Sequence, residues 1–151
     1  MVNEDQYVGG IMDSVMRVVP GSVAWQPMAA QLIGGVRALN SGNWNDALTH
    51  LQAFKSSIPK NTTQNEQPSA LMIANDYLHT CLMNMGRYGA ARDCLEENIA
   101  IATSNHQSFH LMDAYGNFAH SFQFVGDSVQ AEKYRLKFLE CRDEIVNKKR
   151  L

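Results

Sequence analysis

The sequence has little net charge and no long apolar run. Its net charge is -2, from 13 Lys and Arg against 15 Asp and Glu, so it lacks the basic field that attracts nucleic acid or an anionic membrane. No apolar stretch reaches the length of a membrane span. No basic segment followed by an apolar core opens the sequence, so we expect no secretion signal. We therefore expect an intracellular protein, cytoplasmic or nuclear, with no direct nucleic-acid partner and no membrane partner.

Cysteine and β-strand signals are also scarce. The three cysteines, Cys81, Cys94 and Cys141, are an odd number, lie far apart and each fall in a helical pattern. Such spacing favours reduced, partly buried thiols over a disulfide framework. Runs of alternating apolar and polar residues are missing, and no Asn-Gly or Asp-Gly hairpin turn is present. We expect an all-α protein.

Residue patterns that carry chemistry are weak. His106 and His110 are four residues apart with Asp113 beyond, a spacing that could hold a metal on one helix face. However, His106 falls in a polar break, no HExxH signature is present and no cysteine joins the group. Solvated or capping side chains are the simpler interpretation. We therefore predict no catalytic residue, no metal site and no cofactor, and keep an enzyme only as a third, disfavoured alternative.

Apolar residues recur at helical spacing along most of the chain, which predicts seven helices. We expect a lone helix within residues 1–20 and three helix hairpins at residues 22–58, 70–103 and 109–149. The segment 59–68 is polar, lacks periodicity and has a proline at each end, so it is predicted to be a surface loop.

One six-residue frame occurs three times, at Gly42–Ala47, Gly86–Ala91 and Gly126–Ala131. It consists of glycine, a polar residue, a residue that is aromatic in two copies, two further residues, and alanine. The glycines are separated by 44 and 40 residues, a period typical of helical repeat proteins. Glycine can take the left-handed conformation that ends a helix, so each frame is predicted to be the turn of a hairpin. The pair Gly34–Gly35 lies inside a helical pattern, and we expect it to allow close approach of a neighbouring helix.

This pattern resembles the tetratricopeptide repeat (TPR) family over roughly residues 25–145. The Gly-x-aromatic-x-x-Ala core is present in the first two copies. A small residue seven positions before the turn glycine fits at Gly35 and Ala119 and departs at His79, and Ser128 departs from the aromatic position. A proline after the second helix fits at Pro59 alone. The resemblance implies a right-handed superhelix of stacked hairpins in one TPR-like domain.

The repeats are longer than in most TPR proteins. Longer repeats are similar to those of kinesin light chain, of TPR subunits of the anaphase-promoting complex, and of the TPR subunit of the cohesin-loading complex. The last resembles this chain in the lone helix ending at Pro20, the spacing from Gly35 to Gly42, and the run 42–47. By that resemblance the chain would be a C-terminal fragment of a longer superhelix.

In TPR proteins the first helix of each hairpin lines a concave groove. Carrying those positions across implies a peptide-binding set of Leu32, Val36, Asn40, Asp76, Thr80, Met83, Asn84, Asn117, His120 and Gln123. The set contains no lysine or arginine, so we do not expect a clamp for a terminal carboxylate there. It suits an extended segment or a helix bound by side-chain packing and amide hydrogen bonds.

The expected function is therefore a non-catalytic protein–protein interaction module or scaffold subunit whose partner is a protein or peptide. The alternative is a structural part of a larger TPR protein or complex, like kinesin light chain or the anaphase-promoting complex. Its end helices would then pack on further repeats or on another subunit.

Overall fold

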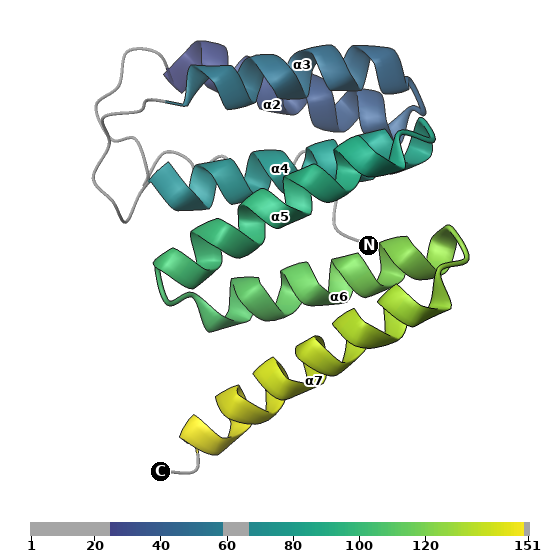
Figure 1. Ribbon diagram of the computed structural model, residues 1–151. Coiled ribbons are helices and arrows are strands. Elements are labelled where there is room, and N and C mark those ends of the chain that lie inside the picture. Colours follow the sequence, from purple (N-terminus) through teal and green to yellow (C-terminus); the bar gives the residue numbers. More distant parts are fainter. Residues whose placement is uncertain (1–24, 59–66, 150–151) are drawn as a thin grey trace. The chain divides into compact units, whose positions relative to one another are not determined.

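The computed structural model describes residues 25–58 and 67–149, and within these ranges the chain is helical and contains no strand (Figure 1). This confirms the all-α prediction for the described part. The helices are α2 (Trp25–Asn40), α3 (Trp44–Ser57), α4 (Gln67–Asn84), α5 (Tyr88–Ser104), α6 (Ser108–Phe124) and α7 (Ser128–Lys149). The lone helix predicted within 1–20 and residues 59–66 of the predicted loop lie outside the described residues.

The start of α4 corrects one expected boundary. The sequence predicted a loop to residue 68 and a helix from about residue 70, but α4 already begins at Gln67. Pro68 therefore lies in the first turn of the helix, where its missing N–H has no intrahelical partner to lose. Proline marked a helix start here, not the last residue of a loop.

The chain divides into two compact units at Arg87, and each is described by itself. In the first unit, α3 packs against both α2 and α4. The side chains of Met28, Leu51, Phe54 and Cys81 are fully buried. Lys55 of α3 donates a hydrogen bond from Nζ to Oδ1 of the buried Asn75 in α4, at 2.8 Å.

The glycine pair in α2 lies directly against α3. A Cβ atom at Gly35 would be 2.7 Å from Cδ2 of Leu51, and one at Gly34 would be 3.1 Å from the His50 ring. Nδ1 of His50 lies 2.9 Å from Oε1 of Gln31, within hydrogen-bond distance. The expectation that Gly34 and Gly35 allow a close helix approach is confirmed.

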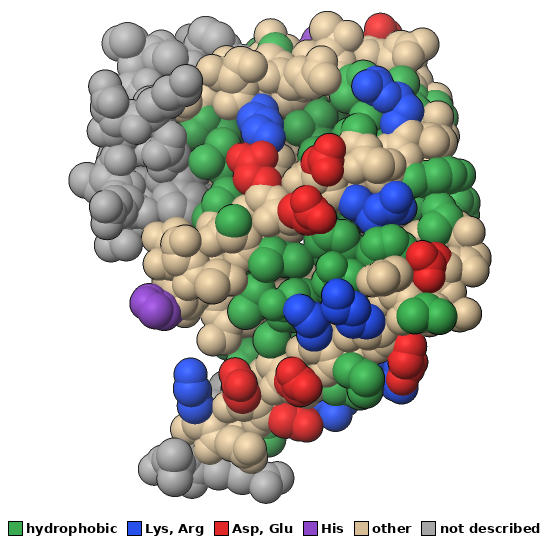
Figure 2. Space-filling view, in the orientation of Figure 1, with side chains coloured by type: hydrophobic (Ala, Val, Ile, Leu, Met, Phe, Trp, Pro, Cys, Tyr) green, Lys and Arg blue, Asp and Glu red, His purple; other side chains and the backbone are tan. Residues whose placement is uncertain are grey.

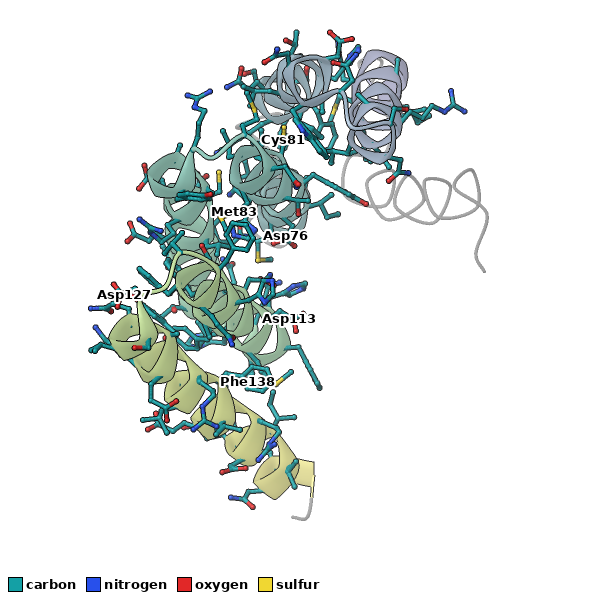
Figure 3. The ribbon with its side chains drawn as sticks, turned by 90° about the vertical axis from the view of Figure 1, so that its right-hand side faces the viewer. Asp76, Cys81, Met83, Asp113, Asp127 and Phe138 are labelled. Atoms are coloured by element: carbon teal, nitrogen blue, oxygen red, sulfur yellow. The ribbon has the colours of Figure 1, made fainter. Side chains whose placement is uncertain are left out.

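In the second unit, α6 packs against both α5 and α7. The rings of Phe118 and Tyr134 stack at 4.6 Å between centroids, and a Cβ at Gly116 would be 3.3 Å from Cδ2 of Phe138. Phe138 is labelled in Figure 3. Between residues 128 and 148, α7 has half-buried and exposed side chains and none that is fully buried. Figure 2 shows acidic and basic side chains along this helix.

The three predicted turn glycines share one local geometry. Gly42, Gly86 and Gly126 have φ of 76°, 75° and 85°. At each turn the N–H of the following residue donates to the carbonyl five residues back, at 2.9 Å. This is the Schellman closure of a helix C-terminus. The same closure occurs where α5 ends, with His106 in the left-handed conformation at φ 55°. The sequence had indicated only a polar break there.

Candidate functional site

Four of the implied peptide-binding residues share one face of α4. Asp76, Thr80 and Asn84 follow at intervals of four residues and are exposed, and Met83 beside them is half-buried. Oγ1 of Thr80 donates to the carbonyl of Asp76 at 3.2 Å, and Nδ2 of Asn84 donates to the carbonyl of Thr80 at 2.8 Å. Asp76 and Met83 are labelled in Figure 3. The result is a polar strip in which the Thr80 hydroxyl and the Asn84 amide can make further hydrogen bonds.

Three implied residues share one side of α6. Asn117, His120 and Gln123 follow at intervals of three and are exposed. Thr80 and His120 each lie six residues before a turn glycine, Gly86 and Gly126, so they hold the same position relative to the end of their helix. Because α4 and α6 belong to different units, we describe two separate faces and not a single groove.

The α2 members of the implied set behave differently. Asn40 is exposed at the end of the helix, whereas Leu32 is 0% and Val36 2% exposed. Met28, Leu32 and Val36 follow at intervals of four and form the buried stripe of α2. Leu32 and Val36 therefore offer no surface to a partner in this structure, and we remove them from the binding set. Both side chains are part of the hydrophobic core.

The described residues contain no group of three His, Cys, Asp or Glu side chains placed to hold a metal ion. His110 and Asp113 are both exposed on α6, and His106 is in the turn before it. The residues His106, His110 and Asp113, which are close in sequence, are therefore not placed together as a set of three metal ligands.

None of the three cysteines forms a disulfide, and the surroundings of Cys81 and Cys141 raise the pKa of their thiols. Burial raises the pKa of Cys81, opposed by the charge of Arg87, and the Cys81 Sγ–H donates to the carbonyl of Trp44 at 3.3 Å. Burial, then the carboxylates of Glu144 and Glu140, raise the pKa of Cys141. A raised pKa lowers the thiolate fraction at neutral pH, and the thiolate is the nucleophile.

Sequence reasoning did not find a pocket of about 440 Å³ that opens between the start of α6 and the end of α7. Its lining residues are His106, Gln107, Ser108, Phe109, His110, Ile145 and Lys148. Oε1 of Gln107 is buried and has no hydrogen-bond partner among the described residues. The spacing of the two histidines was the one local signal of this site, and it says nothing about the residues of α7 that complete it.

None of the described helices is both long enough and apolar enough to cross a membrane. Comparison of the chain with models of known protein families, with curated proteins and with solved structures gave no match.

Proposed function

We propose that this chain is a TPR-like stack of helix hairpins that binds another polypeptide without catalysing a reaction. The repeated turn supports this proposal. Gly42, Gly86 and Gly126 hold the same left-handed conformation and hydrogen bonding at spacings of 44 and 40 residues. Regular repetition of one helix-ending geometry is what a stacked repeat architecture requires. The resemblance to the TPR subunit of the cohesin-loading complex extends the proposal to a subunit of a larger assembly.

The observation that carries the binding function is the pair of exposed faces on α4 and α6. They present hydroxyl, amide, thioether and imidazole groups, and Asp76 is their one charged member. Amides and hydroxyls can pair with the N–H and C=O groups of a bound segment, while Met83 adds an adaptable apolar contact. Surfaces of this kind recognise polypeptide backbone better than they recognise a single strong charge.

The test is affinity capture with cross-linking from an extract of the source cells, using the intact chain as bait. Thr80→Glu and His120→Glu, made separately, place a charge on each face. We expect each to lose partners that the wild type recovers. Thr49→Glu is the matched control, because Thr49 is also exposed and its Oγ1 also donates to a carbonyl four residues back, at 3.1 Å. Equal recovery by all three variants would place the binding surface elsewhere.

A second candidate, a structural part of a larger assembly, is favoured by exposed apolar residues at the α6–α7 turn. Phe124 is 63% and Val129 77% exposed. Neither position is apolar after the other two turn glycines: Asn40 and Asn84 correspond to Phe124, and Asn45 and Gly89 correspond to Val129. Exposed apolar patches often mark protein contacts.

Light scattering after gel filtration separates the two candidates. If the turn packs on another subunit of the same kind, the wild type self-associates as its concentration rises and Phe124→Asn with Val129→Asn abolishes this. If the chain is only a binding module, both proteins remain monomeric over the same range.

A further inference from the structure

The side of α7 that faces away from α6 carries exposed apolar residues. Tyr134 of α7 stacks on Phe118 of α6, whereas Val129, Leu136 and Val146 are 77%, 49% and 41% exposed. In the described residues of the first unit, no large apolar side chain is exposed to this degree. Exposed apolar residues that gather on one helix often mark a protein contact.

The spacing of these residues is that of a seam between two helices. Val129 and Leu136 are seven residues apart, and so are the half-buried Leu139 and Val146. Alternating steps of three and four residues connect them along one stripe of the helix, and the two intervening positions are acidic. We name as the outer stripe the six residues Val129, Glu132, Leu136, Leu139, Asp143 and Val146. Its period fits a second helix lying along α7.

The outer stripe reads alike in both directions. Taken in order, its residues are valine, glutamate, leucine, leucine, aspartate and valine. A stripe with this symmetry is complementary to a second copy of itself that runs antiparallel about a two-fold axis. Leu136 then packs on Leu139 of the second copy, and Val129 packs on Val146 of the second copy.

Charged residues at one edge of the stripe match under the same symmetry. The axis brings Lys133 of one copy close to Glu140 of the other, and this contact occurs twice because the pairing is mutual. Both residues are exposed. They are seven positions apart, about 10 Å along the helix axis, so they do not pair with each other within one chain.

The two acidic residues of the stripe meet each other in this arrangement, and arginines offset their repulsion. Nη2 of Arg135 lies 2.6 Å from Oε1 of Glu132, and Nη2 of Arg142 lies 3.4 Å from Oδ1 of Asp143. Both pairs are exposed. With Lys133 and Glu140 they make three acidic and three basic residues, so no net charge on this set opposes the approach of a second copy.

We propose that the outer stripe binds a second copy of this chain, with α7 lying antiparallel against α7. The proposal rests on the second candidate function, a structural part of a larger assembly, and names the partner and the surface. Because only four apolar side chains from each copy form the contact, we expect a dissociation constant on the order of 100 µM. The wild type is then monomeric at low micromolar concentration.

The experiment is analytical ultracentrifugation of the full chain over a concentration series that reaches about fivefold above that dissociation constant. We expect a monomer–dimer equilibrium in the wild type. Leu136→Asn with Val146→Asn should raise the dissociation constant at least about tenfold, because apolar burial in the contact is lost. Phe124→Asn is the matched control, since Phe124 is an exposed apolar residue outside the stripe. It should leave the dissociation constant unchanged.

An exchange of charges tests the antiparallel pairing directly. Lys133→Glu and Glu140→Lys, made separately, should each weaken the dimer about tenfold, because two attractive contacts become repulsive. The double variant exchanges the two charges and should restore the wild-type dissociation constant. Because the two residues do not pair within one chain, such a restoration reports contact between copies. Circular dichroism at low micromolar concentration checks that each variant is folded.

The outcomes separate this proposal from the functions on which it builds. A wild type that stays monomeric over the whole series would overturn it, together with the self-association expected for the second candidate, and would leave binding by the faces of α4 and α6 untouched. If Phe124→Asn dissociates the dimer and the variant of the stripe does not, the copies meet at the α6–α7 turn and the outer stripe is not the interface. A double charge variant as weak as the single ones would contradict the antiparallel pairing.

Discussion

His106 holds a backbone conformation that glycine holds at the other three turns. Its φ of 55° is unfavourable for a residue with a Cβ atom. His106→Gly should therefore raise the free energy of unfolding by about 0.5 kcal/mol, because the relieved strain exceeds the added flexibility of the unfolded chain. Urea denaturation of the two proteins measures the difference.

Gly86→Ala is the reverse control. Gly86 has φ 75°, and an added Cβ would meet nothing within 4 Å, so its effect is purely conformational. We expect a loss of about 1 kcal/mol. Equal stability of Gly86→Ala and the wild type would show that the left-handed conformation costs nothing at these turns.

The surroundings of Cys141 predict how fast its thiol reacts at a given pH. Since its pKa is raised by burial and by Glu144 and Glu140, the neutral thiol persists to higher pH and its thiolate fraction at pH 8 is low. At pH 8 we expect iodoacetamide to alkylate Cys141 more slowly than it alkylates the thiol of free glutathione. Glu144→Gln should speed the reaction, and mass spectrometry of the labelled peptides reports the rates. The raised pKa also stabilises the fold below the ordinary thiol pKa, and this contribution is lost as pH rises.

Cys81 is the internal comparison for that measurement. It is 0% exposed, so its modification requires local unfolding as well as ionisation. It should react later than Cys141 at every pH. A faster reaction at Cys81 would contradict both its burial and the raised pKa.

At the scale of an element, the contact of α2 with α3 depends on the absence of one Cβ atom. Gly35→Ala would place a methyl group 2.7 Å from Cδ2 of Leu51, which is itself fully buried. We expect a net loss of about 1–3 kcal/mol despite the better helix propensity of alanine. Thermal unfolding followed by circular dichroism measures it.

Gly89→Ala is the matched control, because Gly89 is in helix α5 and an added Cβ there would meet nothing within 4 Å. Here propensity acts alone, and the change should stabilise by about 0.5–1 kcal/mol. Opposite signs for the two substitutions are the expected result. The same sign for both would mean that α2 and α3 adjust freely to the added methyl group.

The ends of the helices were easier to predict from the sequence than the contacts between helices. Glycines 42, 86 and 126 marked helix ends because a left-handed residue is a local requirement. Leu32 and Val36 were placed on a binding surface because their spacing alone does not say which face a neighbouring helix covers. The bond between Lys55 and Asn75 was invisible for the same reason, since its partners come from different helices.

Across the whole molecule, residues at the same distance after each turn glycine change character at α7. Leu51 of α3 and Leu95 of α5 are fully buried, but the corresponding residue of α7 is Arg135, whose Nη2 lies 2.6 Å from Oε1 of Glu132. The next turns repeat this change: Ile58 and Ala102 are buried, and Arg142 takes their place. Charged residues at positions used for packing in α3 and α5 give this side of α7 a polar, exposed surface.

This pattern predicts the behaviour of a variant that restores the apolar residues. Arg135→Leu with Arg142→Ala should expose an apolar stripe on α7 and cause self-association or increased binding of a hydrophobic dye. Arg135→Lys with Arg142→Lys is the control and should behave as the wild type. Analytical ultracentrifugation over a concentration series makes the comparison, and a monomeric Leu/Ala variant would show that the two arginines do not keep this side of α7 from associating.

The pocket between α6 and α7 is the part of the molecule least accessible from the sequence. His110 and Lys148 are 38 residues apart, and they line one cavity only because α6 and α7 form a hairpin and diverge at its open end. Helical periodicity predicts both helices but not the angle at which they separate. The exposed faces of α4 and α6 were easier to predict, since each lies on a single helix.

The turns at residues 42, 86 and 126 end their helices with the same left-handed glycine and the same hydrogen bond, so locally they are three copies of one backbone joint. A segment excised between two of these glycines begins and ends in the same dihedral state, so duplicating or removing it would create no new kind of bend. Gain or loss of the segment between two of these glycines would thus be limited by the surfaces that the new neighbours present, and not by the backbone at the point of joining.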